Sequence, residues 1–203
     1  GWVANWRQVP AGKRTSTSET VTERWLIEAN GNFAGFDYRA AFGNSKNEAT
    51  EGTADGYTLN SVISAGVANG IINPFGPQTA AGSALINSAK ANGPTTVGKG
   101  DVDFVDFRLN RDLFKMQNGT VAGALGMEFR KEKYGFEATD LTAQLPSLGV
   151  DPDSDTSGDR DVKALFFEFN LPILKNLEMT FAGRYDDYSD FGNTFNQIGR
   201  AHV

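Results

Sequence analysis

Residues 121–134, VAGALGMEFRKEKY, decide the fold class of this chain. Apolar residues and glycine at the odd positions alternate with a second face that becomes charged at Glu128, Arg130 and Glu132. A period of two residues is typical of a β-strand with one apolar and one polar face. The stretch therefore predicts a long, two-faced strand.

The same alternation recurs along the chain, at about 21–29, 34–45, 102–116, 162–171 and 177–186. These runs of about ten to fourteen residues are longer than the ~5–6 residues of an average strand in soluble proteins. A tilted strand of about 9–11 residues crosses a bilayer, and a barrel wall alternates apolar residues toward lipid with polar residues toward the lumen. We therefore expect an all-β fold, a segment of an antiparallel up-and-down transmembrane β-barrel.

The expected connections alternate between short and long. Tight turns are expected at 30–32, 117–120 and 174–176, the first two because Asn-Gly supports the positive φ of a hairpin turn. Long polar loops are expected at about 47–100 and 137–160, with a shorter one at 187–193 and no amphipathic helix between the strands. Short turns at one end and long extracellular loops at the other are typical of outer-membrane barrels.

Composition excludes several classes of function. The 203 residues include 23 Gly and 15 Phe, which favours β structure, but no Cys and one His. Catalysis by Cys or a Ser-His pair and thiolate metal sites are thereby excluded, so any catalysis would have to use carboxylates. The carboxylates on one strand have no flanking cleft, and we expect no enzyme, no cofactor and no metal site. The acidic loop at 151–161 also lacks the glycine and glutamate of an EF-hand, which leaves weak binding of a divalent cation or a solvated surface loop as its alternatives. A formal net charge of −6 argues against a nucleic-acid partner.

Four further motifs carry a family resemblance. They are FEFNLPIL at 167–174, RYDDYSDFG at 184–192, GMEFRKE at 126–132 and GIINPFG at 70–76. From about residue 17 to 196 the chain resembles the β-barrel region of TonB-dependent outer-membrane receptors. The resemblance implies active import, across the outer membrane of a Gram-negative bacterium, of a bulky, scarce solute such as a siderophore or an oligosaccharide.

The resemblance also implies an organisation. The family has a barrel of about 22 strands around an N-terminal plug, and this chain would supply about six to eight of them. Residues 1–196 would be a partial barrel without the plug. The implied partners are the TonB-ExbB-ExbD complex through the missing plug region, an extracellular small solute and outer-membrane lipid. Residues 197–203, QIGRAHV, depart from the family pattern, and we expect them to be a non-native tail.

Charged residues on the polar faces are the candidates for the barrel lumen, where they would guide substrate or contact the plug. They are Asp37, Arg39, Glu128, Arg130, Glu132, Glu168, Arg184 and Asp186. The alternative is that opposite charges simply satisfy one another across the wall. In the longest loop, Asn73, Pro74 and Phe75 are the candidates for contact with the extracellular solute.

Two other functions are compatible with long two-faced strands. One is a passive porin or adhesin-like barrel, and the other is a soluble extracellular β-sandwich that binds a ligand. A membrane barrel would place aromatic residues in girdles at the two bilayer interfaces, whereas a sandwich would bury them between sheets. The candidate girdle residues are Trp25, Tyr38, Phe42, Tyr134, Tyr185 and Tyr188.

Overall fold

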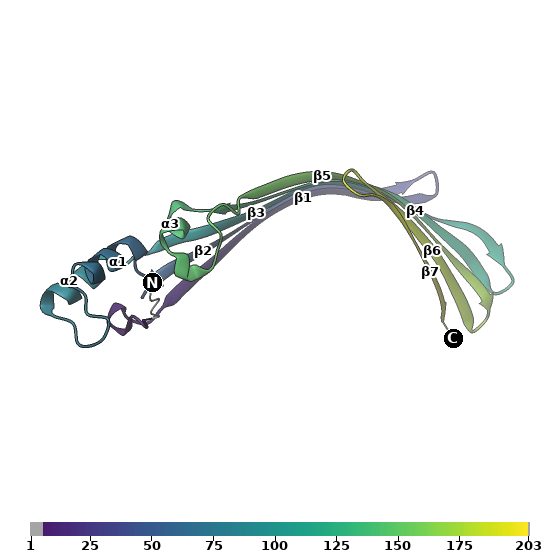
Figure 1. The fold of residues 1–203 in the computed structure, drawn as a ribbon. Helices are drawn as coiled ribbons and strands as arrows, with labels where there is room; N and C mark the ends of the chain where they lie inside the picture. Colours follow the sequence, from purple (N-terminus) through teal and green to yellow (C-terminus); the bar gives the residue numbers. More distant parts are fainter. Residues whose placement is uncertain (1–5, 203) are drawn as a thin grey trace. The chain divides into compact units, whose positions relative to one another are not determined.

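A computed structural model describes residues 6–202 of the protein. In that range seven strands form one sheet in chain order, so each strand pairs with its sequence neighbour (Figure 1). The strands are β1 (Thr15–Phe33), β2 (Phe36–Asp55), β3 (Gly93–Met116), β4 (Gly119–Ala138), β5 (Thr156–Leu174), β6 (Leu177–Tyr188) and β7 (Gly192–His202). This up-and-down meander confirms the predicted all-β fold class.

Two-residue turns join three of the strand pairs. The predicted turns near 117–118 and 175–176 are confirmed, since β3 ends at Met116 and β5 at Leu174. The turn predicted at 30–32 is wrong, because those residues continue β1. The chain reverses instead at Ala34 and Gly35, whose φ angles of 52° and 78° are those of a hairpin turn with two positive-φ residues.

The long connections contain helices, which corrects the expectation of loops without them. The segment expected as a loop at 47–100 begins with the end of β2, continues through α1 (Asn60–Ala68) and α2 (Ala80–Ser88), and ends in β3. The segment expected at 137–160 contains α3 (Asp140–Gln144) and the 3-10 turn η2 (Pro146–Leu148). Alternation does not predict the outer ends of these strands, because both faces are polar there and no period of two residues is visible in the sequence.

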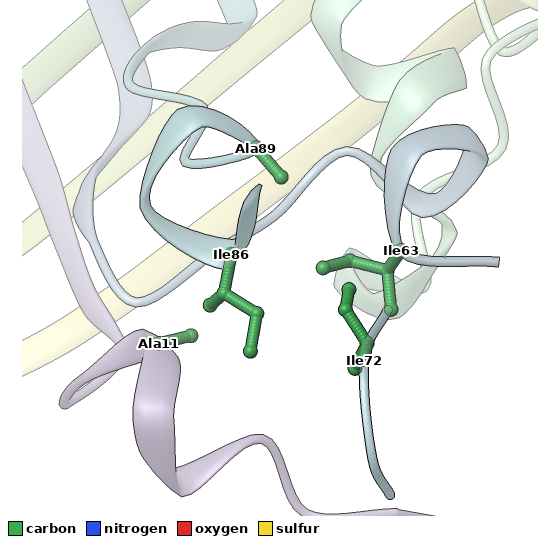
Figure 2. Close-up of a cluster of buried hydrophobic side chains, with 5 residues drawn as sticks. All are labelled: Ala11, Ile63, Ile72, Ile86 and Ala89. Atoms are coloured by element: carbon green, nitrogen blue, oxygen red, sulfur yellow. The ribbon is translucent and has the colours of Figure 1, made fainter. Parts of the chain in front are cut away.

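The chain divides into two compact units. The first comprises Gly1–Val21, Asn47–Lys99 and Gly135–Ser157. Its hydrophobic cluster joins Ala11 of the 3-10 turn η1 (Val9–Ala11) to Ile63, Ile72, Ile86 and Ala89 around α1 and α2 (Figure 2). These side chains are at most 5 % exposed, so a small core holds the two helices.

The second unit comprises Thr22–Lys46, Gly100–Tyr134 and Gly158–Val203. It contains the strand segments in which the alternation is strongest, and β6 pairs with β5 and β7 in antiparallel register. Residues 197–202 continue β7 opposite β6. Alternation breaks in this segment, since Gln197 follows Phe195 on one face and Ile198 follows Asn196 on the other. The non-native origin of 197–203 stays a prediction.

Candidate functional site: the charged face of the strands

Strand register sorts the side chains of the second unit onto two faces. In the β5–β6 ladder Phe166 lies opposite Arg184, whereas Leu165 lies opposite Tyr185. Since successive side chains point to opposite faces, even positions of these two strands form one face and odd positions the other. The even face is charged, and the odd face carries large apolar side chains.

The apolar face is exposed rather than packed against a second layer. Trp25 and Phe42 make an edge-on ring contact at 5.5 Å, yet both remain about half exposed. So do Phe129 and Leu165 on β4 and β5. An extended exposed apolar surface on a chain without a covering layer marks an interaction with another protein or with a membrane.

The apolar face ends where each strand changes to polar residues. The changes, two residues apart on the same face, are Trp25 to Glu23, Phe42 to Asn44, Val105 to Asp103, Phe129 to Lys131, Leu165 to Lys163 and Tyr185 to Asp187. A band with a shared boundary across six neighbouring strands is the pattern expected at a bilayer interface. Four of the candidate girdle residues lie on this face, whereas Tyr134 and Tyr188 lie on the charged face, where they meet Gly158 and Arg160.

The charged face of β4, β5 and β6 carries a connected ladder of ion pairs. Arg184 contacts Asp186 at 2.8 Å and Glu128 at 3.1 Å. Glu128 in turn accepts from Arg130 at 2.9 Å. Nε of Arg130 lies 2.5 Å from Glu132 but makes no aligned hydrogen bond, so that contact is an ion pair by distance alone.

A second group of charges lies on β1, β2 and β3. Arg39 bridges Glu28 at 2.7 Å and Asp106 at 3.1 Å, so it ties three strands together. Asp37 accepts a hydrogen bond from the amide of Asn32 at 3.0 Å. Each predicted charge in the two groups therefore has a partner, with one exception: among the described residues, Glu168 makes no ion pair.

Three partners were missed by the sequence analysis. Glu28 and Asp106 hold Arg39, and Arg160 of β5 contacts Glu132 at 2.5 Å. Their positions on the polar face follow from the alternation of their own strands, and this signal could have found them. The register between strands decides which carboxylate contacts which arginine, and this register cannot be predicted from the alternation within a single strand.

The RYDDYSDFG motif builds the β6–β7 connection. Tyr188 stacks on Phe191 with ring centroids 4.2 Å apart, and the Arg160 guanidinium lies 5.6 Å from the Tyr188 ring. Ser189 and Asp161 exchange two hydrogen bonds, in which each backbone N–H is a donor. The aromatic and hydroxyl residues of the motif therefore fix this connection against β5.

The candidate solute-contact segment is a closed turn in the first unit. The backbone N–H of Asn73 donates to the side chain of Gln78 at 3.0 Å, and the Gln78 amide donates back to the Asn73 carbonyl. The Asn73 side chain accepts from the N–H of Phe75 at 3.0 Å. Phe75 is 90 % exposed, so the turn holds an aromatic ring in solvent. Pro74 lies between them.

Acidic residues of the 151–161 segment serve the local backbone. Asp151 accepts from the N–H of Asp153 at 3.0 Å, and Asp155 accepts from the N–H of Ala138 at 2.7 Å. Over residues 6–202 no three His, Cys, Asp or Glu side chains group so as to hold a metal ion. In the same range no helix is long and apolar enough to cross a membrane.

Breaking the ion-pair ladder is expected to destabilise the wall. Arg184→Met would leave Glu128 without one partner and Asp186, which is 5 % exposed, without a counter-charge. Because Arg184 is itself partly exposed, we expect a loss of about 1–3 kcal/mol in the free energy of unfolding. Urea unfolding measures it. The matched control is Glu168→Gln, which removes a charge without an ion pair and is expected to change stability by less than about 0.5 kcal/mol.

Acid is expected to loosen the first unit at Asp55. This last residue of β2 accepts from Lys90 at 2.9 Å, and that bond, with a second from the Gly56 backbone, lowers the pKa of Asp55 below its ordinary value. A lowered pKa stabilises the folded state above pH about 4. This contribution is lost as the pH falls through the lowered pKa. The protection of the α2 amides against hydrogen exchange, taken relative to the intrinsic exchange rate at each pH, should fall more on acidification in the wild type than in Asp55→Asn, and an equal fall would contradict the assignment.

Comparison with known proteins agrees with the geometry. The model of the family described as TonB dependent receptor-like, beta-barrel matches residues 2–202. No curated protein and no solved structure matches the chain. The match spans almost the whole sequence, and the up-and-down strands with one apolar and one charged face are those of such a barrel wall. The chain therefore belongs to the family of TonB-dependent receptor β-barrels, which serve TonB-dependent transport across the outer membrane.

Proposed function

We propose that the chain forms part of the wall of an outer-membrane receptor that imports a bulky, scarce solute, such as a siderophore or an oligosaccharide, with energy from the TonB-ExbB-ExbD complex. The observation that carries the proposal is the shared boundary of the apolar face across six neighbouring strands. In this proposal the apolar face contacts the lipid of a Gram-negative outer membrane and the charged face lines the lumen.

The height of the apolar band supports a bilayer. On β4 it runs from Val121 to Phe129. About nine residues of strand extend roughly 30 Å, and at a tilt of about 40° they cover roughly 23 Å of bilayer, close to the ~25 Å apolar band of outer-membrane barrels. A soluble sandwich would instead cover this face with a second sheet.

The candidate lumen residues have two different roles in this proposal. The ladder from Arg184 to Glu132 satisfies its own charges, so we assign it to the rigidity of the wall rather than to solute contact. Glu168 makes no ion pair with a described residue and remains available to a plug or a solute. The ladder charges therefore compensate one another, and Glu168 stays the candidate for contact with a plug or a solute.

We assign the first contact with the solute to the turn at 73–75. Asn73 takes part in three hydrogen bonds that close the turn, and Phe75 presents its ring to the outside. Aromatic rings held in a fixed conformation bind other molecules at low entropic cost. Binding of the solute to whole cells should fall severalfold in Phe75→Ala. Phe33→Ala removes another highly exposed ring, which is 76 % exposed beside a two-residue turn, and should leave binding unchanged.

Uptake in cells with and without TonB tests the proposed transport. Accumulation of the solute that supports growth should require both the receptor and TonB, while binding at the cell surface should require the receptor alone. Accumulation that continues without TonB would overturn the proposal in favour of a passive porin. Recovery of the protein from the soluble fraction, folded without detergent, would overturn the membrane assignment itself.

A further inference from the structure

A hollow on the charged face contains an arginine that has no carboxylate partner among the described residues. It measures about 430 Å³ and is lined by Arg108, Asn110, Phe166, Glu168, Arg184 and Asn196, among others. Volumes of this order are typical of small-molecule sites. Arg184 is neutralised by Asp186 and Glu128, whereas no described residue forms an ion pair with Arg108. Positive charge without a partner is therefore concentrated at Arg108.

The guanidinium of Arg108 lies over the aromatic ring of Phe166. It lies 5.1 Å from the centroid of the Phe166 ring, and Arg184 lies 6.0 Å from the same ring. The ring itself is packed on Gly126, since a Cβ at that position would be only 2.1 Å from the Phe166 Cζ. A guanidinium stacked on an aromatic face keeps the N–H donors at its edge free for a planar oxyanion.

The other lining groups suit the same ligand chemistry. The side-chain amides of Asn110 and Asn196 contribute neutral N–H donors to the hollow. Glu168 contributes the opposing charge, which weakens the binding of any anion there. An anion in the hollow must therefore be attracted by Arg108. Its oxygens must be able to accept hydrogen bonds from the paired N–H donors of the guanidinium.

We propose that this hollow binds a carboxylate group of the transported solute, held by the guanidinium edge of Arg108 and assisted by the amides of Asn110 and Asn196. The inference rests on the proposed import function and deepens it by naming a chemical class, a solute that carries carboxylates. Arg108 here is a specificity-determining residue, and the ion-pair ladder keeps its support, Phe166, in place through Arg184.

Calorimetric titration of the detergent-purified protein with citrate tests the inference. Wild type should bind citrate, and Arg108→Gln should weaken binding at least tenfold. Arg24→Gln is the matched control, because Arg24 also lies over an aromatic ring, 5.8 Å from Phe104, and makes no ion pair with a described residue, but lies outside the hollow. Binding by Arg24→Gln should equal that of wild type, and Glu168→Gln should bind severalfold more tightly because it loses the opposing charge.

Three calorimetric outcomes would overturn the inference. They are no citrate binding by wild type, equal binding by Arg108→Gln and wild type, and an equal loss in Arg24→Gln. Arg108→Lys separates a folding defect from a binding role, since it keeps the charge but not the paired donors, and it should bind citrate more weakly while unfolding at the wild-type urea concentration. If Arg108→Gln instead exposes another protein segment to protease, the carboxylate partner is that segment and the solute assignment fails. The proposed transport fails separately, through TonB-independent accumulation.

Discussion

Leu125→Arg is expected to prevent stable insertion of the barrel wall. Leu125 lies in the middle of the apolar band of β4 and is 48 % exposed on that face. An arginine on the lipid face at the bilayer midplane costs about 2–4 kcal/mol. Because folding stabilities of domains are only about 5–15 kcal/mol, we expect much less folded protein in the outer membrane. Gel mobility of unheated samples measures the folded fraction.

The control for this variant is one residue away. Ala124→Arg introduces the same charge at the same depth, but on the charged face, where Ala124 lines the hollow beside Arg108. We expect Ala124→Arg to fold nearly as well as wild type. If both arginines are equally harmful, or equally harmless, the two faces do not differ in environment and the assignment of the apolar face to lipid is contradicted.

Gly126→Val is expected to have the second large effect. In this unit glycines lie under aromatic rings of neighbouring strands, and a Cβ at Gly126 would fall 2.1 Å from Phe166. The ring would have to leave its rotamer or the strands would have to separate, at a cost of about 3 kcal/mol. The midpoint of urea unfolding should therefore fall.

Two further variants make the Gly126 result specific. Gly100→Val adds the same side chain in β3, where a Cβ would meet nothing within 4 Å, and should be close to neutral. Phe166→Ala combined with Gly126→Val should lose less stability than the two single changes added together, because the ring that clashes is absent. Additive losses would show that the clash is not between these two residues.

Close pairing of glycine and aromatic residues explains a feature of composition that the sequence left ambiguous. The pairs on adjacent strands are Gly31 with Tyr38, Gly43 with Phe104, Gly126 with Phe166, Gly158 with Tyr134 and Gly183 with Phe167. An excess of glycine favours turns when a sequence is considered alone. Here these glycines lie inside strands, where the missing Cβ leaves room for a ring, so Gly31 continues β1 and the turn forms at Ala34 and Gly35.

The predictable part of the fold is the part in which one face is apolar. Alternation placed the central segments of β1 to β6 correctly, because burial on one face alone imposes a period of two. It failed from Asn47 to Asp55, where β2 continues with polar residues on both faces. It also failed at α1 and α2, short helices rich in small residues, where Ile63 and Ile86 are the large buried apolar side chains and Val62 and Leu85 pack beside them.

The candidate site also has a part that the sequence predicts and a part that it does not. The alternation of each strand assigned Arg39, Glu128, Arg184 and their neighbours to the polar face, and the structure places them there. It did not identify Arg108 as an arginine that makes no ion pair with a described residue, because that distinction depends on contacts between strands. Residues whose roles depend on register are the ones that single-strand patterns miss.

Cysteine labelling along β4 tests the central claim most directly, since the chain contains no Cys of its own. Single cysteines would replace Leu125, Met127 and Phe129 on the apolar face and Ala122 and Ala124 on the charged face. In intact outer membranes a water-soluble maleimide should label the two charged-face positions and leave the three apolar-face positions unlabelled, and all five should react after denaturation. Equal labelling of both faces in the folded protein would contradict a wall with lipid on one side and water on the other.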